Sequence, residues 1–142
     1  MKKRLTMGLV CTLLLVIISN LACAAIVDNE TAALLIESVS KENFDYFDVE
    51  VDEDGQFICR VGVDGVSVAV AMAKAAGYDE TFPEWVEVKD NMIAMYDSMK
   101  ELLETMEVDN PNPLIFVVNE NNPENALLAI AYGVVLYDVL AE

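Results

Sequence analysis

The chain has 142 residues, of which 25 are Asp or Glu, 8 are Lys or Arg and none is His, so its formal net charge is −17. The lack of histidine excludes Ser-His-Asp and Cys-His catalysis, histidine zinc sites and histidine pH switches. The negative charge disfavours nucleic acid and anionic lipid as partners, and it favours cationic partners, divalent ions or simply solubility outside the cell.

The first 24 residues have the pattern of a bacterial secretory signal peptide. A basic start precedes an apolar run, residues 5–18, that is shorter than a typical membrane span. Two cleavage routes remain open: removal before Ala25 releases a secreted chain, whereas lipoprotein-type cleavage before Cys23 leaves that cysteine lipidated. Both routes predict export. Membrane contact is expected only through the leader or through a lipid anchor on the outer side of the cytoplasmic membrane.

Residues 25–142 are expected to form a single acidic domain. They keep all 25 acidic residues and only five basic ones, a formal charge of −20. About 118 residues suffice for one compact core, and neither a repeat nor a linker divides them. Cys11 and Cys23 belong to the leader, so Cys59 is the one cysteine certain to stay in the folded domain, and no internal disulfide is predicted. Because no histidine is present to activate a thiol, we expect Cys59 to be a small buried hydrophobic residue.

The first element of the domain is predicted to be a short helix. Asp28 or Asn29 is placed to cap it, because Asp and Asn side chains accept hydrogen bonds from the first N–H groups of a helix. Apolar residues then recur at helical spacing, at Ala32, Leu35, Ile36 and Val39. This spacing indicates an amphipathic helix.

The segment DVEVDEDGQFICRV, residues 48–61, predicts a β-hairpin. Opposite residues of a hairpin share a face, and a three-residue loop at residues 53–55 brings the apolar residues together with Gly55 in the favoured third position. The predicted pairs are Val51–Phe57, Val49–Cys59 and Phe47–Val61 on one face, and Glu50–Ile58 and Asp48–Arg60 on the other. The second face is the candidate binding surface, called the hairpin face below, and it consists of Tyr46, Asp48, Glu50, Ile58 and Arg60.

The acidic tip of the hairpin has a second interpretation as a cation site. Aligned with a helix-loop-helix calcium loop, Glu50, Asp52 and Asp54 take the first three ligand positions and Gly55 takes the turn position. The twelfth position requires a bidentate glutamate but is Val61, and the flanking segments are strand-like. We therefore interpret the tip as a turn, with weak divalent-cation binding by Asp52 and Asp54 as the alternative.

A helix is the favoured interpretation of the next segment. Residues 66–72 alternate as a strand would, but the AMAKAAG that closes the segment is typical of a helix end. We expect a helix from Val66 to Ala76, with Gly77 as its C-terminal cap.

The longest helix is predicted to begin at a capping box, Thr81 and Glu84 around Pro83, and to end near Glu107. Its apolar stripe repeats every seven residues and consists of Trp85, Met92, Met99 and Met106, with Val88, Met95 and Leu102 between them. Such a stripe faces a core or a second copy of the helix. The thioethers of Met92, Met95 and Met99 offer an alternative role as a Cu(I) site.

The last part of the domain is predicted to be a strand and a helix. Two prolines in VDNPNP end the long helix, and the all-apolar Leu114–Val118 suits a central strand. Asn122 and Pro123 then begin a C-terminal helix that is expected to extend to about Leu140 and to face the sheet or a second copy.

These elements predict an α+β fold in which the helices pack on one face of a small sheet and leave the other face partly open. The leading functional expectation is an exported, non-enzymatic module of the cell surface or secreted fraction. It would bind a protein or cationic ligand without a cofactor, through the hairpin face. The alternatives are a small metal-binding protein and, in third place, a hydrolase working through paired carboxylates. A homodimer through the long helix or the C-terminal helix is a further expectation.

Overall fold

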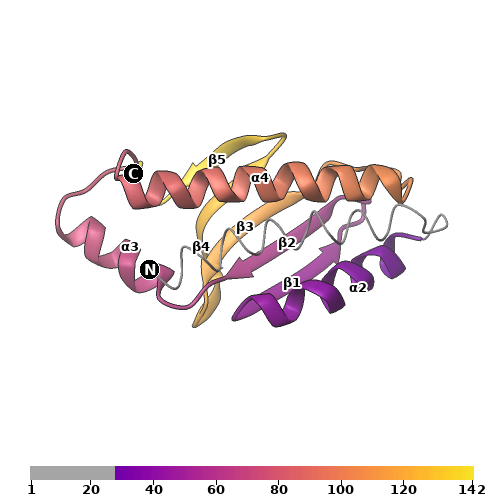
Figure 1. The fold of residues 1–142 in the computed structure, drawn as a ribbon, viewed down its shortest axis with the longest axis horizontal. Helices are drawn as coiled ribbons and strands as arrows, with labels where there is room; N and C mark the ends of the chain where they lie inside the picture. The colour runs from indigo at the N-terminus through magenta and orange to yellow at the C-terminus, as the bar shows by residue number, and fades with distance from the viewer. Residues whose placement is uncertain (1–27) are drawn as a thin grey trace.

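The computed structural model describes residues 28–142, which contain three α-helices and a mixed sheet of five strands. The expected α+β class is confirmed. In chain order the elements are α2 (Asn29–Ser40), the 3₁₀ helix η1 (Lys41–Asn43), β1 (Tyr46–Val51), β2 (Phe57–Gly62), α3 (Val66–Ala75), α4 (Pro83–Thr105), β3 (Leu114–Asn119), β4 (Asn122–Ala131) and β5 (Val134–Asp138) (Figure 1). The predicted leader, its cleavage sites and the lipidation of Cys23 lie outside the described residues.

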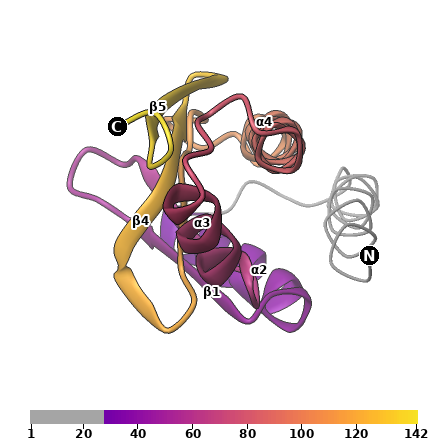
Figure 2. The same ribbon diagram turned by 90° about the vertical axis from the view of Figure 1, so that its left-hand side faces the viewer.

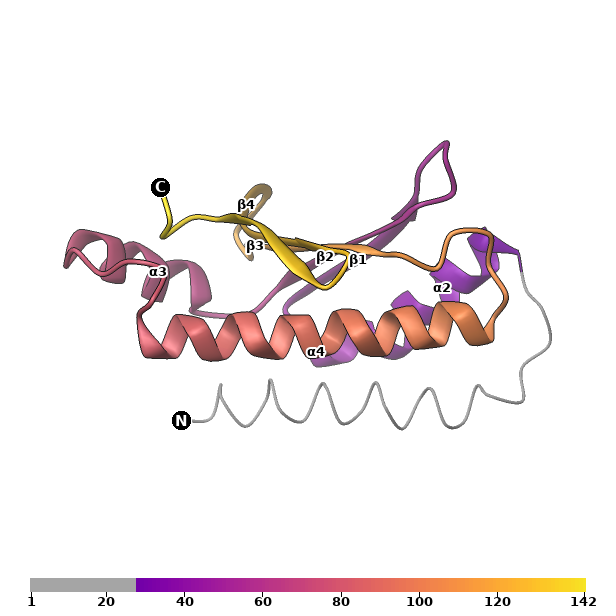
Figure 3. The same cartoon turned by 90° about the horizontal axis from the view of Figure 1, so that it is seen from above.

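The strands follow the chain order β1-β2-β3-β4-β5 across the sheet. Only β2 and β3 are parallel, and the long connection between them contains α3 and α4. The helices lie on the same side of the sheet, as Figures 2 and 3 show from two directions. No described helix covers the opposite face, which is called the open face below, so the expected layering is confirmed for residues 28–142.

The predicted hairpin register is confirmed residue by residue. Tyr46–Val51 pairs with Phe57–Gly62, and each expected cross-strand pair is present. The turn is closed by a carboxylate, because Asp52 Oδ1 accepts hydrogen bonds from the backbone N–H groups of Asp54 and Gln56, each at 2.9 Å. Gly55 has a φ of 78°, the left-handed conformation for which glycine was expected at this position.

The three predicted helices before β3 are present, with one error at a helix start. Asp28 caps α2 by accepting from Thr31 N–H at 2.7 Å, and α3 is helical as favoured. The capping box expected for α4 is wrong: Phe82 is the N-cap residue and makes no side-chain capping bond. The Thr81 hydroxyl instead donates to Asp79 Oδ1 at 2.6 Å, because a short Asp-x-Thr turn competes successfully for that side chain.

The predicted C-terminal helix is also wrong, because residues 122–138 form the antiparallel strands β4 and β5. A continuous apolar run does not by itself distinguish a helix from a strand that is buried on both faces. Residues 127–131 of β4 are all buried, so this segment lacks the alternation of apolar and polar residues that would have identified it as a strand. The turn between the strands is Tyr132-Gly133, with φ values of 53° and 73° at its two residues.

The core lies between the sheet and α4. The heptad stripe faces this core, and Met92, Met95, Met99, Leu102 and Met106 are at most 1% exposed. The inner face of the hairpin contributes Phe47, Val49, Phe57, Cys59 and Val61 to the same cluster. The stripe is therefore covered by this chain's own sheet. The predicted burial of Cys59 is confirmed, and burial raises the pKa of its thiol far above the usual range.

Candidate functional site

The hairpin face lies on the open side of the sheet. Arg60 is its centre, with Nη1 at 3.2 Å from Asp48 Oδ2 and Nη2 at 3.2 Å from Glu50 Oε1. These hydrogen bonds, the Glu50 bond foremost, raise the pKa of Arg60. One guanidinium thus pairs with two carboxylates and neutralises the charge of only one, so the cluster of three side chains keeps a net negative charge.

A hollow of about 500 Å³ extends from the hairpin face across the sheet. Its lining comes from four strands: Tyr46, Glu50, Arg60, Phe116, Val118, Pro123, Glu124 and Ala126. Sequence reasoning found the three residues of the hairpin and missed the other five. Pro123, Glu124 and Ala126 were missed because residues 122–126 were assigned to a helix, and Phe116 and Val118 because their place beside the hairpin depends on the pairing of β3 with β2. The alternation in β3 is the signal that was available, since Ile115 and Val117 are buried while Phe116 between them is only partly buried.

A second hollow, of about 620 Å³, adjoins the first. The two share Phe116, Glu124 and Ala126, and the second continues over β4 to Tyr137 and Val139. The open face is therefore a shallow surface in which aromatic rings alternate with carboxylate and amide groups.

A close approach at the end of β2 supports one border of the first hollow. A Cβ at Gly62 would lie 2.9 Å from Tyr46 Cβ and 3.1 Å from Glu120 Cα, so only glycine fits between them without a shift. Glu120 Oε1 accepts from Gly65 N–H, at the start of α3, at 2.9 Å. Burial raises the pKa of Glu120, but hydrogen bonds from backbone N–H groups and from the Ser67 side chain outweigh it and lower the pKa overall.

The methionines and Asp52 of the two predicted metal sites have structural roles in the fold. Met92, Met95 and Met99 are core residues, and the carboxylate of Asp52 already accepts two backbone hydrogen bonds in the turn next to Asp54. Within residues 28–142, no group of three or more Asp, Glu or Cys side chains is arranged to hold a metal ion.

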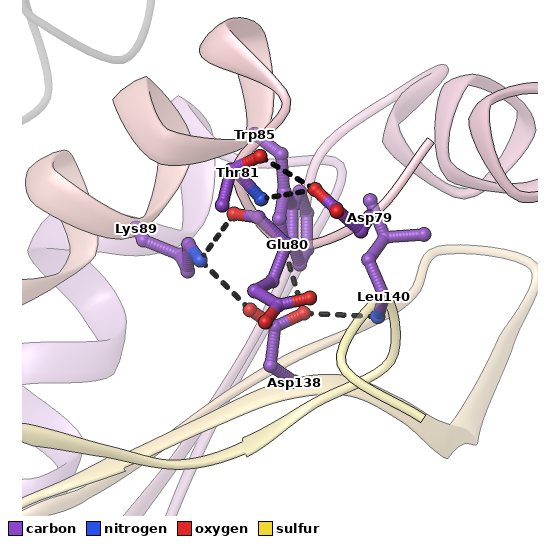
Figure 4. A network of polar contacts seen from close by, with 7 residues as sticks. All are labelled: Asp79, Glu80, Thr81, Trp85, Lys89, Asp138 and Leu140. Atoms are coloured by element: carbon purple, nitrogen blue, oxygen red, sulfur yellow. Dashed lines mark hydrogen bonds and ion pairs between the residues drawn. The ribbon is translucent and has the colours of Figure 1, made fainter. Parts of the chain in front are cut away.

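A buried polar network joins the first turns of α4 to the end of β5 (Figure 4). Asp138 Oδ1 accepts from Trp85 Nε1 at 2.8 Å and from the Leu140 backbone N–H at 2.9 Å, and Asp138 Oδ2 lies 2.9 Å from Lys89 Nζ. Lys89 also donates to the Glu80 carbonyl at 2.8 Å. The network attaches the end of β5 to the first turns of α4. Sequence reasoning had no signal for it, because about fifty residues separate the partners.

No family model, curated protein or solved structure matches this chain. Within residues 28–142, none of the helices has both the length and the hydrophobicity that a membrane crossing requires.

Proposed function

We propose that this chain is an exported, non-enzymatic binding module that recognises a cationic segment of another protein. The observation that supports the proposal is the hollow on the open face, where Tyr46, Phe116, Glu50 and Glu124 line one surface that no described helix covers. Export is a part of the same proposal and is supported by the signal-peptide pattern of residues 1–24.

The lining suits a Lys or Arg side chain on chemical grounds. Such a side chain has an apolar stem that packs on an aromatic ring and a charged head that seeks a carboxylate. Tyr46 and Phe116 offer the rings, while Glu50 and Glu124 offer the carboxylates. The electrostatic field of the whole chain also favours a cationic ligand. The chain has 25 acidic residues and only 8 basic ones, so it attracts positive charge from a distance.

The test is a titration of the mature protein with acetylated tetralysine and tetraarginine peptides, followed by backbone amide chemical shifts. We expect the shifts to concentrate at Tyr46, Glu50 and Phe116, because these residues line the hollow. Shifts spread evenly over the acidic surface would show that only net charge is recognised, and they would contradict the proposal.

A pair of charge reversals gives the matched control. Glu124→Lys places a positive charge in the hollow, and we expect it to weaken peptide binding about tenfold or more, since like charges in a partly desolvated site cost over 1 kcal/mol. Glu101→Lys makes the same change on the exposed surface of α4, on the other side of the sheet, and should weaken binding much less. Equal effects of the two substitutions would remove the hollow from consideration.

A further inference from the structure

The last hairpin carries an exposed apolar edge that is separate from the hollow used above. Among residues 28–142, nine large hydrophobic side chains are exposed, and four of them lie in this hairpin: Tyr132 at 68%, Val134 at 54%, Val135 at 37% and Leu136 at 61%. They belong to β5 and to the turn before it. Strand β5 is the outermost strand at its end of the sheet (Figure 1).

The outer side of β5 is open to another strand. Within the described residues, the backbone-to-backbone hydrogen bonds of Val134–Tyr137 are those with β4 alone. Leu136 has no partner in β4 at all, because a bulge shifts the register between Ala129 and Ile130. An edge of this kind presents unpaired N–H and C=O groups that another strand can pair with.

The other edge of the sheet, strand β1, is protected, so the exposed edge is a feature of β5 and not of both ends of the sheet. Strand β1 carries Asp48 and Glu50 within its length, and α2 packs against it. Charged residues, a covering helix and a β-bulge are among the devices that prevent pairing at an edge; β1 has the first two, and β5 has the bulge alone. By contrast, residues 126–137 contain no charged side chain and no proline.

The chemistry of the edge matches a second copy of the same edge. An interface with twofold symmetry places one patch against itself, so an apolar, uncharged patch is complementary to its own copy. Two copies of residues 25–142, each with a formal charge of −20, repel each other elsewhere, and the uncharged stretch is where they meet without opposing like charges. Asp138, at the end of β5, is turned to Lys89 of its own chain.

We propose that β5 pairs with β5 of a second copy, antiparallel about a twofold axis at Leu136, so that two five-stranded sheets join into one. In this arrangement Leu136 faces Leu136 of the second copy, and Val135 faces Tyr137. The contact is short, so the dimer is of the weak class that dissociates in the micromolar range.

The first test is the mass of the mature protein by light scattering and sedimentation between about 1 and 300 µM, a range that brackets a micromolar Kd. We expect a monomer that becomes a dimer with concentration, and a dimer that tightens several-fold as salt rises, because salt screens the repulsion between two acidic chains. A monomer at every concentration and salt would overturn the proposal.

Substitutions then locate the contact. Leu136→Lys places charges face to face at the axis and should weaken dimerisation at least tenfold. Leu34→Lys makes the same change at an equally exposed position on α2 and should leave dimerisation unchanged. A dimer that resists Leu136→Lys, or one that Leu34→Lys disrupts equally, would place the interface elsewhere.

Cross-linking tests the register. Residues that face each other in an antiparallel pair have Cα atoms about 4.5–5.5 Å apart, within the range of a disulfide, so Leu136→Cys should oxidise to a covalent dimer. Leu34→Cys is the control, and buried Cys59 should not react in either variant. If the protein stays monomeric but binds a lysine-flanked Val-Thr repeat peptide, and Leu136→Lys abolishes this binding, then the edge accepts a cationic strand and the second copy is ruled out as its occupant.

Discussion

Glu107 and Tyr132 have φ values of 55° and 53°, a backbone region that side chains other than Gly, Asn and Asp rarely occupy. Glu107 adopts this conformation because α4 ends just before it. Val108 N–H bonds to the Leu103 carbonyl at 3.3 Å, and Glu107 N–H bonds to the Glu104 carbonyl at 3.1 Å, which is the pattern that usually places glycine at this position. The α3 helix ends in the same way, with Gly77 at the equivalent position.

This comparison predicts that Glu107→Gly stabilises the protein. Relief of the left-handed backbone should raise the free energy of unfolding by about 1 kcal/mol, measured by urea denaturation. Gly77→Ala is the matched opposite, and it should cost about 1 kcal/mol from conformation alone, because no atom lies within 4 Å of a Cβ placed there. A loss of stability in Glu107→Gly would show that the Glu107 side chain makes a contact worth more than the strain.

Glu120 gives a prediction for pH. Its pKa is lowered from the usual 4.5, so its carboxylate stabilises the fold above pH 4.5, and this contribution is lost as the pH falls through the lowered value. Glu120→Gln should therefore cost about 1 kcal/mol near pH 7, below the roughly 1.5–3 kcal/mol of a buried hydrogen bond to a charged group, because solvent partly screens this carboxylate. The difference from the wild type should shrink towards pH 3.

Urea unfolding at several pH values measures this difference. Glu101→Gln, on the exposed surface of α4, removes the same formal charge without such a hydrogen bond and is the control. A difference between Glu120→Gln and wild type that stays constant from pH 7 to pH 3 would mean that the shape of the side chain matters, rather than its charge.

At the scale of elements, the sequence predicted those with a clear period or a fixed turn length. The β1–β2 hairpin was predicted to the residue because only one loop length places Val49 opposite Cys59 and Asp48 opposite Arg60. The β4–β5 hairpin was missed because residues 126–131 are apolar throughout and contain good helix formers. Tyr132-Gly133 was the overlooked turn signal, and it is weak because the first position of such a turn usually holds Asn, Asp or Gly.

The sequence predicted only the part of the candidate site that lies on the correctly predicted hairpin. The hairpin face followed from local register, whereas Phe116 and Glu124 join it only through pairings between distant segments. The partners in the Asp138 network are also brought together by tertiary structure alone. Local sequence patterns carry no record of such pairings.

The attachment of β5 to α4 gives a prediction at this scale. Asp138→Asn leaves the Lys89 ammonium, whose side chain is 15% exposed, without its anionic partner, and this should cost about 3 kcal/mol. Hydrogen exchange should then show β5 opening before the rest of the sheet. Lys100→Met is the control, because its pair with Glu104 at 3.8 Å is exposed and should contribute under about 0.5 kcal/mol.

The double variant Lys89→Met/Asp138→Asn separates the charge from the hydrogen bonds. Removing both charges should recover part of the loss, since the uncompensated ammonium is gone and Asn still accepts from Trp85. If the double variant is as unstable as the sum of the single ones, then the ion pair is not the source of the cost.

At the scale of the whole molecule, net charge opposes folding. Residues 25–142 carry 25 acidic and five basic side chains, and compaction brings these like charges together. Of the five basic residues within residues 28–142, Arg60, Lys74, Lys89 and Lys100 each lie within 4 Å of a carboxylate, so the attractive pairs are few and the repulsive pairs many. Salt should therefore stabilise the folded chain, because at about 0.5 M it screens repulsion beyond a few ångströms.

We expect the melting temperature to rise by several degrees between about 0.02 and 0.5 M NaCl, which corresponds to roughly 1 kcal/mol for a domain of this size. The measurement belongs at about 1 µM protein, below the range in which a weak dimer forms, so that association does not add to the shift. Chloride is the anion of choice, because sulfate stabilises most proteins by exclusion from their surface. A variant with Glu101 and Glu104 both replaced by Gln should gain less from salt than the wild type. A melting temperature that falls with NaCl would mean that the few ion pairs, above all Lys89–Asp138, outweigh the repulsion among the remaining carboxylates.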